Sequence, residues 1–333
     1  MNDFVKTKVE ELRADYTRIK GEPFAHFYCP ILFKDEETPL CQAHIINQAF
    51  TDSARACTVQ RADVDSFYGS RFEADFIDIQ TFRDPSPLEI LTHKKHSKRF
   101  SSKILLDNEP VEFFFGGSQV PEQFTQIKLE GKDLSVPFGL KMHPTDVKAA
   151  EGKHWEIEIS RDVRIPMMVS VIKAAHLTLF NMLGYSYALS PAGHFVGHDI
   201  LGKFFLKNRR KSKAEVLKSA RPFFREFVNM VRPLISCGFD SQGTVIDRTF
   251  YMCMGSSGSA WAMIVFVKTA HIIHGVMMPV FEKAEQAVTY LDFLNNGNES
   301  IQVAICRFEN DRWEISKETK PLNWPKSGTL YPE

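Results

Sequence analysis

The stretch of sequence that decides the fold reads Leu40-Cys41-Gln42-Ala43-His44-Ile45-Ile46-Asn47-Gln48-Ala49-Phe50. Small and β-branched residues surround one histidine in it, a pattern typical of a short strand that ends near a turn. A polar run at 34–39 separates it from the aromatic piece His26-Phe27-Tyr28-Cys29. The region therefore predicts a hairpin or a knuckle-like turn. Three of the chain's six cysteines fall in or beside it and call for a chemical explanation: Cys29, Cys41 and Cys57.

Length and charge limit what the whole chain can be. Its 333 residues suffice for two modest domains, and a hydrophobic content of 44% can fill their cores. Lys and Arg number 41, as do Asp and Glu, so no overall field draws the chain to nucleic acid. Any nucleic-acid surface must come from local segregation of charge.

The sequence also predicts a compartment. The N-terminus is charged and has no apolar run leading to a cleavage site, so we expect no secretory signal and a cytoplasmic location. Six cysteines without a dense framework fit reduced thiols. The longest apolar run, 165–189, contains Lys173, His176 and Asn181, which predicts a buried helix and no membrane partner.

The segment from Leu40 to Phe50, preceded by Cys29-Pro30-Ile31, resembles the core of HNH endonucleases. The resemblance covers roughly residues 24–80 and implies a ββα or treble-clef unit. It makes His44 the general base, beside a divalent ion such as Mg²⁺ or Mn²⁺, and it implies a structural Zn²⁺. Residues 159–185, which contain Lys173-Ala174-Ala175 and Gly184-Tyr185, also resemble a helix found in bacterial proteins with such an N-terminal unit.

The sequence departs from the HNH pattern at the positions of expected ligands. Ala43 stands where a metal ligand usually precedes the base, Leu32 where a second knuckle cysteine is usual, and Asn47 where proline is usual. His44 can therefore be a free base, a zinc ligand or a core residue. The remaining metal candidates are Cys29, Cys41 and Cys57 for Zn²⁺ and Asp63 and Asp65 for Mg²⁺. The competing interpretation makes these cysteines small buried hydrophobes and these acids the cap of a helix.

Two basic clusters are candidates for contact with nucleic acid. The first contains Lys94, Lys95, Lys98 and Arg99, and the second contains Arg209, Arg210 and Lys211. Such runs of charge are more often a solvated loop or helix face, which is the competing interpretation. A second group of metal-ligating residue types lies at His194, His198 and Asp199.

Hydrophobic periodicity predicts the element order. Helices are expected at 3–19, 167–183, 200–206, 212–234 and 282–294, and strands at 126–129, 136–142, 155–160, 245–254, 261–271, 276–281 and 300–307, with a tail from Lys320. We divide the chain into an N-terminal helix (1–23), an HNH-like unit with a basic extension (24–110), an α+β region with a central apolar helix (111–235) and a β-rich C-terminal region (236–333). The predicted class is α+β, with a small ββα unit followed by a larger α+β portion.

The expected function is that of a metal-dependent DNA endonuclease of HNH type, in a setting such as bacterial defence. The alternative is a degenerate, non-catalytic, zinc-stabilised module that binds nucleic acid or protein. DNA is the expected partner, and a second copy of the chain or another protein remains open. A small-molecule enzyme has no motif behind it.

Overall fold

The structure of the chain is a computed structural model. It describes residues 2–46, 56–77, 100–106, 109–115, 124–129, 132–140, 156–158, 164–228, 233–236, 249–255, 258–269, 272–296, 300–309 and 312–323. The chain forms two compact units. The first contains Met1–Ile77 and Val163–Glu333, and the second, Asp78–Asp162, is inserted between them in the sequence. The predicted class, α+β, is confirmed, because runs of helices and runs of strands follow one another along the chain and the described strands pair antiparallel.

The first helix of unit 1 is closed at both ends by its own sequence. In α1 (Asp3–Lys20), the Asn2 side chain accepts a hydrogen bond from the backbone N–H of Val5 at 2.9 Å. Gly21 ends the helix with φ at 82°, which a residue with a Cβ rarely adopts. The buried face carries Val5, Val9 and Leu12, which confirms the predicted amphipathic helix.

A hairpin and a helix follow. Strands β1 (Leu40–His44) and β2 (Cys57–Arg61) pair antiparallel, with Leu40 opposite Arg61 and His44 opposite Cys57. The chain then turns directly into α2 (Ala62–Tyr68) and the π-helix η1 (Gly69–Glu73). The hairpin differs from the predicted one, which placed the piece at 26–29 beside the segment that contains β1. Instead β1 pairs with β2, and Tyr28 forms an isolated bridge with Asp35.

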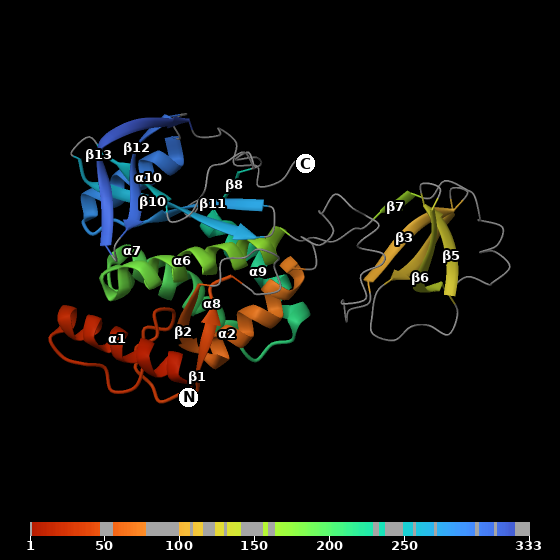
Figure 1. Cartoon of the computed structure of the whole chain (residues 1–333), viewed down its shortest axis with the longest axis horizontal. Coiled ribbons are helices and arrows are strands. Elements are labelled where there is room, and N and C mark those ends of the chain that lie inside the picture. Colours follow the sequence, from red (N-terminus) through yellow and green to blue (C-terminus); the bar gives the residue numbers. More distant parts are fainter. Residues whose placement is uncertain are drawn as a thin grey trace. The chain divides into compact units, whose positions relative to one another are not determined.

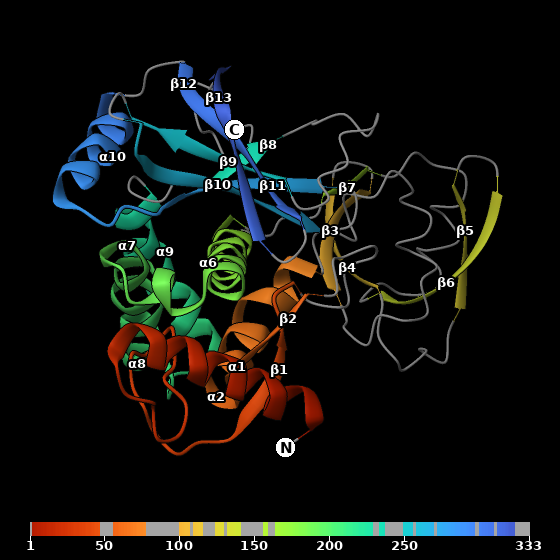
Figure 2. The same cartoon turned by 60° about the vertical axis from the view of Figure 1, so that its left-hand side comes forward.

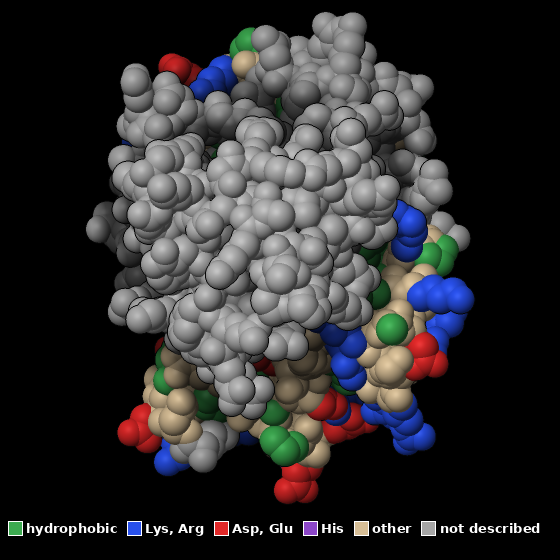
Figure 3. Space-filling view, turned by 90° about the vertical axis from the view of Figure 1, so that its right-hand side faces the viewer, with side chains coloured by type: hydrophobic (Ala, Val, Ile, Leu, Met, Phe, Trp, Pro, Cys, Tyr) green, Lys and Arg blue, Asp and Glu red, His purple; other side chains and the backbone are tan. Residues whose placement is uncertain are grey.

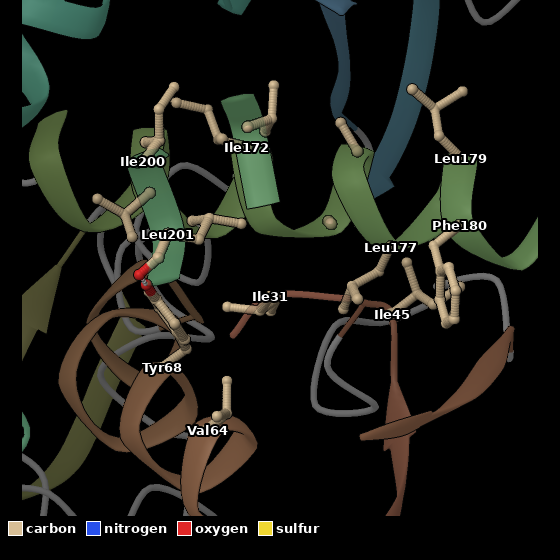
Figure 4. Packing of buried hydrophobic residues seen from close by; sticks show 14 of the residues in the cluster. Ile31, Ile45, Val64, Tyr68, Ile172, Leu177, Leu179, Phe180, Ile200 and Leu201 are labelled. Carbon is tan, nitrogen blue, oxygen red and sulfur yellow. Dashed lines mark hydrogen bonds between the residues drawn. The ribbon is translucent and has the colours of Figure 1, made fainter. Parts of the chain in front are cut away.

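The central helix of unit 1 is α6 (Arg164–Ala188). It is long and apolar enough to cross a membrane by length and composition, but 72% of its apolar window is buried inside the protein. It packs against α1, η1, α7, η2, α9 and three strands of the C-terminal sheet. Figure 4 shows its Leu177 and Phe180 facing Ile31 and Ile45 of the N-terminal region. The predicted buried helix is therefore confirmed.

Three short helical segments and a longer helix follow α6. They are α7 (Pro191–His194), the π-helix η2 (Phe195–Gly202), α8 (Lys203–Asn208) and α9 (Lys213–Val228). The hydroxyl of Tyr68 donates a hydrogen bond to the carbonyl of Leu201 at 2.7 Å, which joins α2 to η2 (Figure 4).

The C-terminal part of unit 1 is a six-stranded antiparallel sheet in the order β13-β12-β9-β10-β11-β8. Its strands are β8 (Pro233–Ser236), β9 (Thr249–Met254), β10 (Ala260–Thr269), β11 (Ile272–Pro279), β12 (Ser300–Glu309) and β13 (Arg312–Asn323), with α10 (Ala284–Asn296) between β11 and β12. The predicted tail from Lys320 is wrong for residues 320–323, which continue β13.

Both faces of this sheet are covered at β10. Met263, Val265 and Val267 belong to the core that contains α6, whereas Ala262 and Ile264 belong to a second core that contains Tyr290 of α10. Successive strand residues point to opposite faces, so a strand covered on both sides reads as one apolar run. Figures 1 and 2 show α6 and α10 against this sheet.

Unit 2 contains a five-stranded antiparallel sheet in the order β5-β6-β4-β3-β7. Its strands are β3 (Phe100–Leu106), β4 (Glu109–Phe115), β5 (Phe124–Leu129), β6 (Lys132–Leu140) and β7 (Glu156–Glu158). The predicted divisions at 110/111 and 235/236 fall inside β4 and β8 and do not coincide with the boundaries of the two units.

Candidate functional site

The turn at 29–33 has the backbone hydrogen bonds of a knuckle but an apolar interior. The N–H of Phe33 donates to the carbonyl of Cys29 at 2.9 Å, and the N–H of Leu32 donates to Cys29 Sγ at 3.4 Å. Phe33 has φ at 54°, in the left-handed region. Cys29 and Ile31 are 0% exposed and Leu32 is 2% exposed. The position of the expected second cysteine is thus filled by a buried leucine.

Burial also sets the protonation of this cysteine. It raises the pKa of Cys29 to about 11, although hydrogen bonds from Leu32 and Ile31 oppose the effect. The sulfur is therefore a neutral thiol near pH 7, and zinc binds the thiolate. The turn 29–33 is stabilised by packing in the core, and apart from Cys29 none of its residues carries a metal-ligating side chain.

The other two predicted cysteine ligands point in opposite directions. Cys41 lies opposite Gln60 in the hairpin, and Cys57 lies opposite His44. Because side chains alternate along a strand, Cys41 lies on one face of the hairpin and His44 and Cys57 lie on the other. Burial raises the pKa of Cys41 to about 11, and Asp65 adds to this effect. Cys29, Cys41 and Cys57 therefore do not form one zinc site.

His44 is the last residue of β1, half-buried. This is the position at a strand end where the HNH resemblance expects a base. Ala43 before it is fully buried on the opposite face. Asn47, the third departure from the pattern, lies outside the described residues.

The two predicted Mg²⁺ ligands on α2 are each held by a different cation. Asp63 accepts hydrogen bonds from Arg61 at 3.1 and 2.9 Å, and Asp65 accepts one from Lys173 at 2.9 Å. Burial alone would raise the pKa of Asp63, but the bonds from Arg61 outweigh it and lower that pKa. Residues two apart on a helix do not face each other. Asp63 and Asp65 thus do not converge on one ion.

A buried ion cluster joins α6 to the hairpin and helix unit. Lys173 Nζ lies 2.7 Å from Glu73 Oε1 and 2.9 Å from Asp65 Oδ1, with the lysine side chain 0% exposed. Burial would lower the pKa of Lys173, but the two carboxylates outweigh it and raise that pKa. The ring of Tyr68 lies 5.9 Å from the same ammonium.

The inner face of the hairpin beside this cluster is polar. Thr58 and Gln60 are 0% exposed and share a face with Cys41 and Ala43. The Thr58 hydroxyl and both amide atoms of Gln60 have no hydrogen-bond partner within the described part of the chain. Buried polar atoms normally have one, so this face has hydrogen-bonding capacity that described residues leave unused.

A groove of about 440 Å³ lies where α2 and η1 meet the end of α8. Three arginines line it together with hydroxyls, aromatic rings and one acid: Arg71, Arg209, Arg210, Ser66, Ser70, Phe67, Phe205 and Asp63. Arg209 and Arg210 are exposed, and no described carboxylate pairs with them. We call this feature the arginine groove.

The groove unites predicted and unpredicted residues. Arg71 of η1, which the sequence analysis did not single out, donates from Nη2 to the carbonyl of Lys211 at 3.3 Å, and its Nε is buried without a described partner. The Lys211 ammonium donates to Asn208 Oδ1 at 3.0 Å. Figure 3 shows Lys and Arg side chains gathered at the lower right of one face, among fewer acids. The first basic cluster, Lys94, Lys95, Lys98 and Arg99, lies outside the described residues.

The described residues contain one group of at least three close metal-ligating side chains, and it is not at the hairpin. It consists of His194, His198 and Asp199, whose ligand atoms lie within 4.8 Å of one another.

Comparisons with known proteins suggest no function, so a function can be inferred only from the geometry of the structure. No family model, no curated protein and no solved structure matches the chain.

Proposed function

We propose that this protein binds nucleic acid through an HNH-like unit that has lost its metal ligands, with the arginine groove as its phosphate-binding surface. The order β1, β2, α2, with His44 ending β1, supports the likeness to an HNH unit. The burial of Cys29 and Leu32 supports a unit held together by its core in place of zinc.

The arginine groove is the observation that carries this proposal. Guanidinium groups bind phosphate oxygens with two parallel hydrogen bonds, and hydroxyls add further donors. Arg71, Arg209 and Arg210 line the groove against one acid, Asp63, which Arg61 already neutralises. The groove also adjoins α2, the helix of the proposed HNH-like unit.

Fluorescence anisotropy with labelled single- and double-stranded DNA tests the proposal. The variant Arg209→Ala/Arg210→Ala should bind at least about tenfold more weakly at low salt. The matched control, Lys20→Ala/Lys317→Ala, removes two exposed cations elsewhere and should bind like the wild type. Absence of DNA binding by the wild type, or equal losses in both variants, would contradict the proposal.

Hydrolysis is a second candidate, favoured by the position of His44 at the end of β1. A supercoiled plasmid incubated with protein and Mg²⁺ or Mn²⁺ tests it. Nicking by the wild type that His44→Ala abolishes would support catalysis. The control variant His26→Ala changes an exposed histidine outside the hairpin. An intact plasmid, or equal nicking by the His44→Ala variant, would reject catalysis by His44.

A further inference from the structure

We propose that His194, His198 and Asp199 form a binding site for one divalent transition-metal ion of the zinc class. None of these residues belongs to the hairpin or to the arginine groove. His194 ends α7, and His198 and Asp199 lie in η2. Histidines four residues apart on a helical segment share one face, as metal-binding histidine pairs require. Short π-helical segments such as η2 occur frequently at functional sites.

The ligand atoms are already close to the separations that an ion requires. Asp199 Oδ1 lies 3.1 Å from His198 Nδ1, and Asp199 Oδ2 lies 3.6 Å from His194 Nδ1. Tetrahedral zinc with bonds of about 2.1 Å places neighbouring ligand atoms about 3.4 Å apart. All three ligand atoms lie within 4.8 Å of one another, so side-chain shifts on the order of 1 Å would bring them to these separations.

Neighbouring groups hold the two imidazoles in place. The Phe33 ring packs edge-on against His194 at 4.7 Å and His198 at 5.8 Å between ring centroids. Gly197 lies so close to the turn at 29–33 that an added Cβ would come within 2.4 Å of the Pro30 carbonyl oxygen. This close approach fixes η2 against the turn, so that the site is preorganised.

Solvent can reach the site. The side chains of His194, His198 and Asp199 are 47%, 29% and 30% exposed. Three protein ligands leave a coordination position open to water or another ligand. Two imidazoles and one carboxylate suit Zn²⁺, Co²⁺ or Ni²⁺, whereas Mg²⁺ and Ca²⁺ prefer oxygen ligands alone.

Lys203 competes with the ion. Its Nζ lies 2.8 Å from Asp199 Oδ1, and its side chain is 59% exposed. An ion that binds this oxygen must displace the ammonium, which can move into solvent. Removal of Lys203 should therefore raise metal affinity, an effect that a histidine pair with only a packing role would not show.

Titration of metal-free protein with Zn²⁺ by calorimetry, and with Co²⁺ by visible absorption, tests the site. The wild type should bind one equivalent, and His198→Ala and Asp199→Asn should each bind at least about tenfold more weakly. Lys203→Ala should bind several-fold more tightly, and the control His26→Ala should match the wild type. Mg²⁺ should not compete.

Each alternative outcome counts against the site. Absence of stoichiometric binding by the wild type overturns the proposal, as does binding that His198→Ala and Asp199→Asn leave unchanged. Circular dichroism of the metal-free variants checks that they are folded. If His198→Ala does not fold, Asp199→Asn and Lys203→Ala still decide the result, because they predict opposite changes in affinity.

Discussion

The ammonium of Lys173 lies 2.7 Å from Glu73 Oε1 in a part of unit 1 where the lysine is 0% exposed. A second carboxylate, Asp65, lies 2.9 Å from the same nitrogen. A lone buried ammonium would be costly, so its charge requires both partners. The cluster thus fixes α6 relative to α2 and η1, which come about a hundred residues earlier in the sequence.

Replacement of the buried lysine should strongly destabilise the fold. Lys173→Met keeps most of the side-chain volume but leaves the carboxylates of Asp65 and Glu73 without this ammonium. We expect a loss of about 3–5 kcal/mol in the free energy of unfolding. Urea denaturation followed by circular dichroism measures it. The triple variant Lys173→Met/Asp65→Asn/Glu73→Gln should recover much of the loss, and a single variant as stable as wild type would contradict this account.

Stability should also depend on pH through His176. This side chain is 0% exposed, with Nε2 3.2 Å from the Pro30 carbonyl and Nδ1 3.0 Å from the Tyr187 hydroxyl. A carbonyl only accepts, so Nε2 carries the proton and Nδ1 accepts from Tyr187. Burial lowers the pKa of His176 from 6.5 to about 4, although the bond to Pro30 opposes the shift.

Proton uptake by the unfolded chain determines how the free energy of unfolding changes with pH. Between pH 6.5 and about 4, the unfolded chain binds a proton at this site and the folded chain does not, so stability falls as pH falls. The contribution lost over this window is about 3 kcal/mol. Urea unfolding at several pH values should show it. The difference between wild type and His176→Asn isolates it from the titration of carboxylates, and parallel pH profiles would refute it.

Local patterns predicted the helices and strands of unit 1 better than the contacts between them. The apolar run around Lys173 predicts a buried helix because hydrophobic composition can be read from neighbouring positions in the sequence. The partners of Lys173 lie far away in sequence, so no spacing rule identifies them. A lysine in the middle of such a run is itself the signal that a buried carboxylate must exist elsewhere.

The candidate site was predicted only in part for the same reason. Sequence proximity grouped Cys41 with Cys57, but the register of β1 and β2 places them on opposite faces. Arg71 was not singled out because only folding brings it beside Arg209 and Arg210. A strand around His44 was predictable, because small and β-branched residues form a local pattern, whereas its end at His44 was expected only from the HNH resemblance.

Gly197 lies in η2, where the helix packs closely on the turn at 29–33, whereas Gly69 at the start of η1 has open space around it. A Cβ at Gly197 would lie 2.4 Å from the Pro30 carbonyl oxygen and 2.8 Å from His176 Cε1, whereas a Cβ at Gly69 meets nothing within 4 Å. Gly197→Ala should therefore destabilise the protein by about 1–3 kcal/mol. Gly69→Ala, at a helical position, should be neutral or stabilise by up to about 1 kcal/mol. Thermal unfolding of both variants measures the difference, and equal effects would show that the contact at Gly197 relaxes easily.

Salt dependence can separate phosphate contact at the arginine groove from a general loss of affinity. Each phosphate neutralised on double-stranded DNA contributes about 0.9 to the slope of log affinity against log salt concentration, and about 0.7 on single strands. Arg209→Ala/Arg210→Ala should therefore reduce the magnitude of the slope by about 1.8 with a duplex and about 1.4 with a single strand. Anisotropy titrations over a range of NaCl concentrations measure it, with Lys20→Ala/Lys317→Ala as the charge-matched control. A weaker affinity with an unchanged slope would mean that the two arginines act through the fold and do not contact phosphate, because lost ion pairs must alter counterion release.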